Sequence, residues 1–287
     1  MEYVTILLDG LAYGMVLFII SVGLTVTMGL MRVINLAHGA FAMIGGYAAA
    51  ALIQAGAPFA VALALATLGV AALGALAELL LYRPIYRKGE LSQSLMTFGL
   101  TFVVIAALTS IFGPGVRPIP IPSALDGMMN LGFRAYPTYR LFLIVVGLAL
   151  MGLLWLLIDG TLFGARLRAA VDNPRMCQAV GVNVRLLFTV AFALGCGLAA
   201  FGAVAGAQLM PLDSYYALRY LVLFLVVVGV GGLGNFRGSF VAAVGLGVVD
   251  TFSKYLVPNA APYVFYGLVV ALLLWRPDGL MPARSAS

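Results

Sequence analysis

Residues 10–31, GLAYGMVLFIISVGLTVTMGLM, run for 22 positions without a charged side chain. About 20 apolar residues are enough for a helix to cross the hydrocarbon core of a bilayer, so this stretch predicts a first membrane-spanning helix. The rest of the chain has the same character, because 63% of the 287 residues are hydrophobic and only 9% are charged. Soluble domains are about 25% charged. The sequence therefore predicts an all-α polytopic membrane protein.

Further apolar stretches predict further spans. Residues 39–77 are free of charge but too long for one crossing, and QAGAP at 54–58 indicates a turn between two helices. The other predicted spans are residues 91–111, 141–158, 186–207, 221–231, 239–256 and 263–275. We expect about eight or nine transmembrane helices, nine when crossings are counted from loop to loop. The run 229–238 leaves eight or ten open, because broken or re-entrant helices are expected there.

The loops predict the orientation. Residues 113–140 contain five prolines, which exclude a continuous helix. Basic residues concentrate in loops 83–90 and 159–185 and in the C-terminal tail, which the positive-inside rule assigns to the cytoplasm. We expect one transmembrane domain over residues 1–287, with the N-terminus outside and the C-terminus inside. The inner set is Arg83, Arg87, Lys88, Arg166, Arg168, Arg175, Arg185, Arg276 and Arg284, and the outer loops hold only Arg117, Arg134, Arg140 and Arg219.

The inner loop 159–185 contains a pattern typical of a short capped helix. In GARLRAAVDNPRMCQAVGVNV, residues 164–184, Asn173 is an N-cap candidate and Pro174 takes the first helical position. Gly181 provides a C-terminal stop, so a helix is predicted over 172–181. Its apolar face consists of Met176, Ala179 and Val180, and the surrounding arginines are Arg166, Arg168, Arg175 and Arg185.

Two interpretations of this loop are open. It is either an ordinary cytoplasmic connection or a docking helix for a soluble partner. So short a helix is marginal alone in water and needs a surface on which to pack. The family resemblance described below favours the docking helix.

Asn35, His38 and Gly39 form a polar interruption between two predicted spans. One interpretation is a short cytoplasmic connection. The other is a broken helix whose free backbone groups line a cavity, as transporters tolerate. A proton relay or metal site at His38 has little support, since no second ligand lies nearby in the sequence.

A second interruption, GVGGLGNFRG at residues 229–238, contains Gly232 and Asn235. It lacks the GxxxxGK[ST] form of a phosphate-binding loop and follows no soluble strand, so a break in a membrane helix is favoured. The two interruptions share a faint pattern, N…xG…F, which is too short to establish an internal repeat.

Few residues suit catalysis. The chain has one histidine, and its two cysteines, Cys177 and Cys196, show neither a disulfide framework nor metal-ligand spacing. Glu78 and Arg83 are close enough to pair, as are Asp250 and Lys254 at i, i+4. With so few candidate catalytic residues, an enzyme is not expected.

The start, MEYVTILLDG, lacks a basic region typical of a cleaved signal peptide.

Three motifs in order along the chain resemble one family. Residues 23–50, GLTVTMGLMRVINLAHGAFAMIGGYAAA, are similar to a pattern near the N-terminus of LivH-type permeases of branched-chain amino acid ABC importers, the hydrophobic amino acid uptake family. Gly46 stands where the family often has alanine. Residues 164–183 resemble the family's cytoplasmic segment, and residues 229–247 resemble its late glycine-rich segment, with Asn235 and Arg237 departing from the commoner small residues.

The resemblance implies an ABC importer permease fold in a bacterial inner membrane. It implies a second permease, LivM-like or a homodimer copy, two ABC ATPase subunits that bind ATP and magnesium, and a periplasmic substrate-binding protein, with no nucleic acid and no cofactor in this chain. The proline-rich loop, about 113–140, is then periplasmic, and the loop of about 159–185 couples to the ATPase. The expected coupling residues are Arg166, Arg168, Asn173, Pro174, Met176, Ala179, Val180 and Gly181, and the expected substrate pathway contains Asn35, His38, Gly39, Gly232 and Asn235.

The resemblance implies branched-chain or related hydrophobic amino acids as substrates. Urea, amides and other small carboxylates are alternatives within similar permeases. An ion-coupled secondary transporter is disfavoured, because that class usually places paired acids at the midplane, whereas Glu78 and Asp250 are both expected near helix ends. The sequence contains no Walker A motif, so ATP hydrolysis is expected in a separate subunit.

Overall fold

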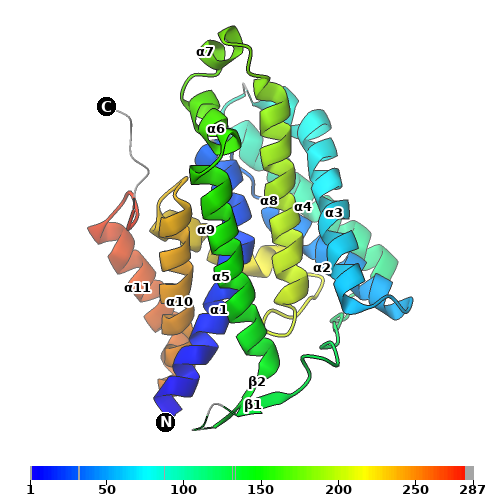
Figure 1. The fold of residues 1–287 in the computed structure, drawn as a ribbon, viewed down its shortest axis with the longest axis vertical. Helices are drawn as coiled ribbons and strands as arrows, with labels where there is room; N and C mark the ends of the chain where they lie inside the picture. Colours follow the sequence, from blue (N-terminus) through cyan, green and yellow to red (C-terminus); the bar gives the residue numbers. More distant parts are fainter. Residues whose placement is uncertain (1, 32, 87, 131, 133, 282–287) are drawn as a thin grey trace.

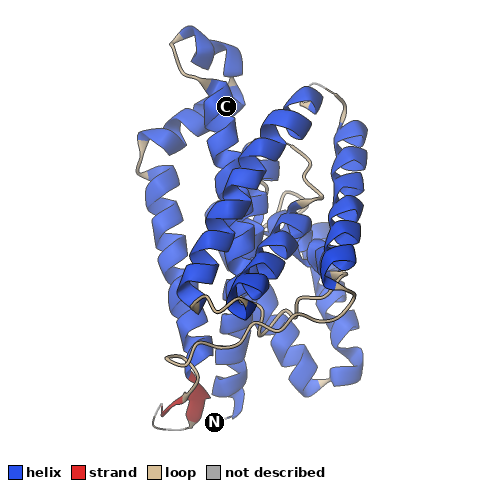
Figure 2. Cartoon of the chain, turned by 90° about the vertical axis from the view of Figure 1, so that its right-hand side faces the viewer, coloured by secondary structure: helices blue, strands red, loops and turns tan. Residues whose placement is uncertain are grey.

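The computed structural model describes residues 2–281 except 32, 87, 131 and 133. The regular structure of the described chain is helical apart from one antiparallel hairpin and one isolated β-bridge, and loops connect these elements (Figures 1 and 2). The π-helical turns η1 and η2 extend α1 and α3. The elements are α1 (Glu2–Leu24), η1 (Thr25–Leu30), α2 (His38–Gln54), α3 (Phe59–Ala77), η2 (Glu78–Tyr82), η3 (Arg83–Ile85), α4 (Glu90–Phe112), β1 (Met128–Asn130), β2 (Ala135–Pro137), α5 (Thr138–Asp159), α6 (Leu162–Asp172), α7 (Pro174–Ala179), α8 (Val184–Ala205), α9 (Tyr216–Gly231), α10 (Phe236–Leu256), η4 (Pro258–Ala260) and α11 (Ala261–Trp275).

Helix α1 is the centre of the bundle. Helices α5, α8, α9 and α10 all pack against it, and nearly every residue from 12 to 24 is buried. A helix that is hydrophobic all round must be covered on every side, which explains why residues 10–31 carry no charge. The structure confirms the first predicted span and extends it back to Glu2.

Close contact between α1 and α10 depends on glycine. A β-carbon at Gly247 would lie 2.5 Å from the α-carbon of Gly14, so neither position leaves room for a side chain. Helices in lipid gain stability from such close backbone packing. The 34 glycines of the chain are partly explained by contacts of this kind.

The bundle has two distinct ends. Helices α6 and α7 lie at one end, called here the α7 end, and the N-terminus and the β1–β2 hairpin lie at the other, the hairpin end (Figure 1). Arg166 and Arg175 belong to the first end and Arg134 to the second, in agreement with the two charge sets. Two arginines of those sets, Arg87 and Arg284, lie outside the described residues.

Each of the nine predicted spans corresponds to a helix. The turn at 54–58 is confirmed, as is the break within 229–238, where α9 ends at Gly231 and α10 begins at Phe236. Helix α9 begins at Tyr216, five residues before the predicted start at 221. Seven described helices are long and apolar enough to cross a membrane, whereas α2 has 17 residues and α9 has 16. The count of nine crossings therefore stays a prediction.

The sequence patterns missed α6 and the hairpin. Helix α6 buries Gly164, Leu167 and Ala170 along one face and exposes Arg166 and Arg168 on the other. Such an amphipathic helix carries no membrane-span signal. The two hairpin strands have only three residues each, too few for a recognisable alternation.

Candidate functional site

The polar interruption after α1 is a buried break. His38 begins α2, and its Nε2 lies 2.8 Å from the carbonyl oxygen of Ile20, in the interior of α1. Asn35 and His38 are both fully buried. Residues 33–37 therefore return into the bundle instead of forming a surface connection, whereas the cavity expected there stays a prediction.

Helix α4 satisfies the backbone of this break. The amide of Ile34 donates to Gln93 Oε1 at 3.2 Å, and the amide of Leu36 donates to Thr97 Oγ1 at 3.2 Å. Thr101 donates to the carbonyl oxygen of Leu36 at 3.3 Å. Non-helical backbone at membrane depth requires such partners, because no water is present to replace them. These three α4 side chains were not singled out by the sequence, since their role depends on a contact about 60 residues away along the chain.

Two polar atoms in the break have no partner among the described residues. Asn35 Oδ1 accepts a hydrogen bond from Tyr82 at 2.7 Å, but Asn35 Nδ2 and His38 Nδ1 have none. A buried polar group without a partner is costly, and such groups mark places where water or a ligand can bind. Gly39 follows at the crossing of α2 and α9, where a β-carbon would lie 2.6 Å from the carbonyl oxygen of Ala217.

The glycine-rich break at residues 229–238 lies between α9 and α10, apart from the first break. Asn235 Oδ1 caps α10 by accepting from the amides of Arg237 and Gly238 at 3.0 and 3.1 Å, and its Nδ2 donates to the carbonyl oxygen of Met281. Gly234 packs on Gly29 of η1.

The two breaks therefore contact different levels of the helix formed by α1 and η1. His38 packs on Gly23 of α1, and Gly234 packs on Gly29 of η1, six residues further along the chain. Gly232, with φ of +99°, ends α9 beside Gly279. The structure groups Asn35, His38 and Gly39, and places Gly232 and Asn235 in a separate, capped turn.

The predicted capped helix is confirmed. Asn173 Oδ1 accepts from the amide of Met176 at 3.0 Å, Pro174 is the first helical residue, and Gly181 has φ of +84°. Helix α7 is two residues shorter than predicted at each end, because Asp172 belongs to α6 and Val180 follows α7 as its C-cap. Cys177 faces inward, whereas the side chains of the apolar face point to the surface, with Met176 63% and Val180 73% exposed and Ala179 also exposed.

The two flanking arginines differ. Arg166 is exposed, while Arg168 donates to the carbonyl oxygen of Ile158 at 2.5 Å and to Asp159 at 3.3 Å. Arg168 therefore holds α6 against the end of α5.

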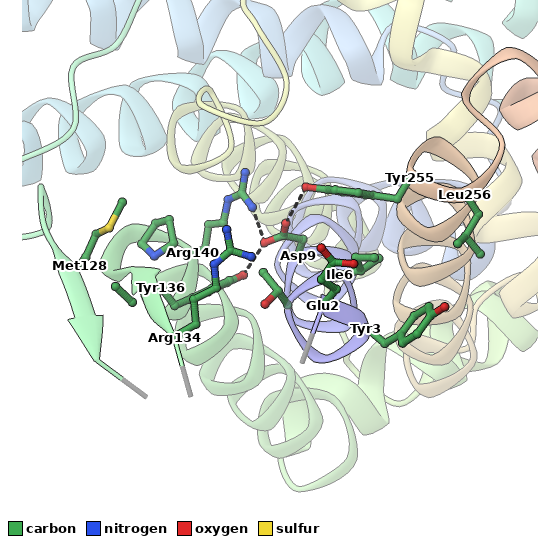
Figure 3. A pocket seen from close by; sticks show the side chains of 13 residues that line it. Glu2, Tyr3, Ile6, Asp9, Met128, Arg134, Tyr136, Arg140, Tyr255 and Leu256 are labelled. Carbon is green, nitrogen blue, oxygen red and sulfur yellow. Dashed lines mark hydrogen bonds and ion pairs between the residues drawn. The ribbon is translucent and has the colours of Figure 1, made fainter. Parts of the chain in front are cut away.

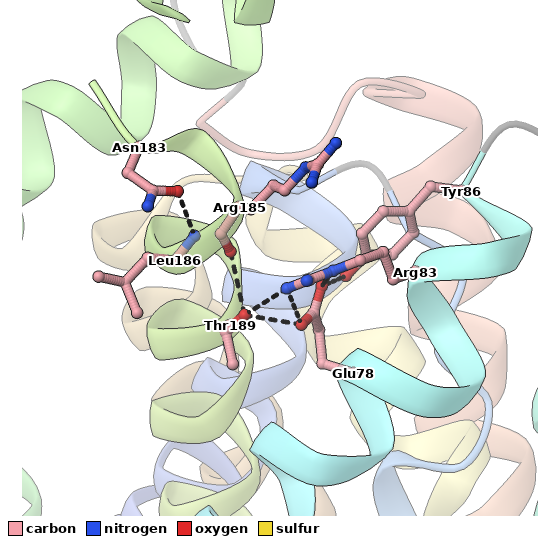
Figure 4. A network of polar contacts seen from close by, with 7 residues as sticks. All are labelled: Glu78, Arg83, Tyr86, Asn183, Arg185, Leu186 and Thr189. Atoms are coloured by element: carbon pink, nitrogen blue, oxygen red, sulfur yellow. Dashed lines mark hydrogen bonds and ion pairs between the residues drawn. The ribbon is translucent and has the colours of Figure 1, made fainter. Parts of the chain in front are cut away.

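A buried carboxylate lies at the α7 end, where the sequence indicated only one ion pair. Glu78 is fully buried and bonds Arg83 at 2.8 Å, as predicted, and it also accepts from Tyr86 at 2.9 Å and Thr189 at 2.7 Å (Figure 4). The predicted pair of Asp250 and Lys254 is also present, at 2.5 Å. Thr189 was missed because it lies on α8, 111 residues along the chain from Glu78.

A second charged cluster lies at the hairpin end. Asp9 on α1 is 8% exposed, pairs with Arg140, and accepts from Tyr136 at 2.8 Å and from Tyr255 at 3.4 Å (Figure 3). It forms one wall of a pocket of about 520 Å³ that Arg134 also lines. Burial and the hydrogen bond to Asp9 raise the pKa of Tyr136, so its hydroxyl stays a donor to the carboxylate. The sequence gave no sign of this cluster beyond an isolated aspartate.

No group of three His, Cys, Asp or Glu side chains with metal-binding geometry occurs in the described chain.

Comparisons with known proteins identify the family. The family model described as "Branched-chain amino acid transport system / permease component" matches residues 6–274. The permease protein BraD of a high-affinity branched-chain amino acid transport system in Pseudomonas aeruginosa is 25% identical over 98% of this chain and 96% of its own length. The corresponding Escherichia coli proteins LivH and LivM are 24% and 29% identical, covering 95% and 93% of this chain and 93% and 68% of their own lengths.

A solved structure shows a related fold. PsaBC from Streptococcus pneumoniae in complex with Fab has a TM-score of 0.53 and 13% identity, and the match covers 93% of this chain and 89% of that one. The expected ABC permease fold agrees with this likeness and with the helical bundle. The chain belongs to the family of permease components of branched-chain amino acid transport systems.

Proposed function

We propose that this chain is one of two permease subunits in an ATP-driven importer of branched-chain or related hydrophobic amino acids. The observation that carries the proposal is the family match over residues 6–274, nearly the whole chain. Escherichia coli has two such permease proteins, LivH and LivM, and this chain is similar to both. The partner permease is therefore LivM-like or a second copy of this chain. A periplasmic binding protein delivers the substrate.

Helix α7 is the proposed contact with the ATPase. Its exposed side chains Met176 and Ala179, together with Val180 directly after its end, form an apolar face on a helix too short to be stable alone. Docking on a separate subunit covers that face. ATP and magnesium bind to that subunit, and this chain needs no cofactor of its own.

The buried break is the proposed part of the substrate route. Asn35, His38 and Gly39 come together where α2 starts inside the bundle. Asn35 Nδ2 and His38 Nδ1, which have no hydrogen-bond partner in the described part of the chain, supply polar groups there. Gly232 and Asn235 contribute to the route through the turn that ends α9 and starts α10 at the α7 end, where Asn235 acts mainly as a cap.

Co-purification and stimulated hydrolysis test the proposal. The chain is expressed with its partner permease and ATPase and reconstituted in nanodiscs. We expect the ATPase to co-purify and its hydrolysis to rise when binding protein loaded with leucine is added. If binding protein loaded with urea or an amide stimulates hydrolysis and leucine-loaded binding protein does not, the substrate is urea or an amide instead of a branched-chain amino acid. Absence of a bound ATPase would contradict the importer.

Orientation is tested by cysteine labelling from outside the cell. Cys177 is only 8% exposed, so its failure to react would be uninformative. We instead place single cysteines at two exposed positions, Gln178→Cys on α7 and Ser123→Cys in the proline-rich loop, with Cys177 and Cys196 replaced by serine. A membrane-impermeant maleimide should label Ser123→Cys in intact cells and should label Gln178→Cys only after the cells are opened. In the proposed topology the N-terminus lies in the periplasm. The reverse labelling pattern would overturn that topology.

A further inference from the structure

The buried carboxylate of Glu78 joins two parts of the molecule. It lies in η2, directly after α3, and it receives hydrogen bonds from Arg83 and Tyr86 of the following turn and from Thr189 of α8 (Figure 4). Arg83 also donates to Thr189 at 2.8 Å. In the described chain, both side-chain hydrogen bonds between α8 and residues 78–86 go through Thr189.

Thr189 is connected in turn to α7. The amide of Val182 donates to the carbonyl oxygen of Cys177 at 3.0 Å, which folds the end of α7 back toward α8. Asn183 then caps α8 by accepting from the amide of Leu186 at 3.1 Å. Thr189 follows within the second turn of α8. A short hydrogen-bonded connection therefore links α7 to the part of α8 that contains Thr189.

Elsewhere α7 is separated from η3. A pocket of about 610 Å³ has Arg83 and Tyr86 on one side and Pro174 and Gln178 of α7 on the other. This open space lets α7 move relative to η3 without a steric block. The Glu78 cluster contacts α8 through Thr189 beside this pocket.

Tyr82 extends the contact to the buried break. It is fully buried four residues after Glu78 on the same π-helical turn, and its hydroxyl donates to Asn35 at 2.7 Å. The centroid of its ring lies 4.5 Å from the ring centroid of Phe192, which is one turn beyond Thr189 on α8. Helix α8 therefore touches η2 twice, at Glu78 and at Tyr82. π-Helical turns are uncommon and occur frequently at functional sites.

We propose that Thr189, Glu78 and Tyr82 are positioning residues that transmit movement of α7 to the buried break at Asn35. This inference rests on the proposed function, in which an ATPase moves α7. When α8 shifts, Thr189 displaces η2 through Glu78, and Tyr82 moves Asn35 with it. None of the three residues needs to touch the substrate.

The test measures substrate uptake per ATP hydrolysed by the complete transporter in proteoliposomes. Thr189→Val and Tyr82→Phe each remove one hydroxyl and keep the shape of the side chain. We expect ATPase binding and hydrolysis to stay within about twofold of wild type while uptake per ATP falls by about three- to tenfold, the size expected when a hydrogen-bonded contact is lost. Thr189→Ser keeps the hydroxyl and should restore coupling.

A matched control separates this effect from a general loss of stability. Tyr139→Phe also removes a buried tyrosine hydroxyl, which bonds the carbonyl oxygen of Ala205 away from the Glu78 cluster, and it should leave uptake per ATP unchanged. If the two hydroxyls act in one link, uptake per ATP in the double variant Thr189→Val/Tyr82→Phe should be no lower than in the more impaired of the two single variants. Multiplied losses in the double variant would show two independent effects and overturn the proposal.

The outcomes separate this inference from the proposed function. If the wild-type complex takes up no substrate on addition of ATP, the proposed function fails and the inference falls with it. If the wild type transports and both single variants keep wild-type uptake per ATP, the link is wrong and the proposed function stands. If both variants lower hydrolysis and uptake in proportion, the residues are merely structural and the link is again wrong.

Discussion

Replacing Ala179 by aspartate should leave the permease in the membrane and remove its ATPase. Ala179 lies on the exposed apolar face of α7. A carboxylate there is well solvated in the isolated chain, so folding should not change. Once docked, the charge is desolvated without a partner, which costs at least ~1–3 kcal/mol. Affinity for the ATPase should therefore fall by about tenfold or more.

The measurement is co-purification of the ATPase with each variant, together with uptake in vesicles. Ala124→Asp is the matched control, because it introduces the same charge at an exposed position in the proline-rich loop. It should retain the ATPase. Arg166→Ala, on the exposed flank of α6, should have a smaller effect, since exposed ion pairs contribute only about 0–1 kcal/mol. Normal ATPase binding by Ala179→Asp would contradict the docking role of α7.

Replacing Gly23 by alanine should prevent normal packing of the bundle. A β-carbon at this position would overlap the carbonyl oxygen of Gly195 on α8 and lie 2.8 Å from Cε1 of His38. Alanine normally favours a helix by about 1 kcal/mol over glycine. Here the overlap is with backbone, so α1 and α8 must separate, and overpacking of this kind costs ~1–3 kcal/mol or more.

We expect Gly23→Ala to give less folded protein after extraction, a lower melting temperature and little uptake. Gly69→Ala on α3 is the control, because no atom lies within 4 Å of a β-carbon there. That variant should melt at the wild-type temperature or slightly above it. A Gly23→Ala protein as stable as Gly69→Ala would show that α1 and α8 are not packed as described.

Helix positions could be predicted well because the membrane imposes a simple rule on sequence. Every backbone polar group in lipid must be paired within the protein, so each crossing is a long apolar helix between polar or helix-breaking residues. The turn at 54–58 and the ends of α7 followed directly from glycine, proline and asparagine. These are local effects, and local sequence determines them.

The site could be predicted only in part, because its contacts are long-range. Asn35 and Asn235 occupy similar sequence patterns. Asn35 is nevertheless buried and accepts a hydrogen bond from Tyr82, whereas Asn235 caps α10. Glu78 was linked to Arg83 five residues away, whereas its bond to Thr189 depends on how α3 and α8 pack. Patterns within a few residues cannot distinguish these cases, since the difference lies in tertiary packing.

The most direct test of the importer is leucine uptake into proteoliposomes that contain this chain, its partner permease and the ATPase. Binding protein is supplied on the hairpin side and ATP on the α7 side, and ionophores remove all ion gradients. We predict uptake that requires both ATP and binding protein and that persists after the gradients are removed. Uptake that proceeds without ATP and stops when an ion gradient is removed would contradict an ATP-driven importer.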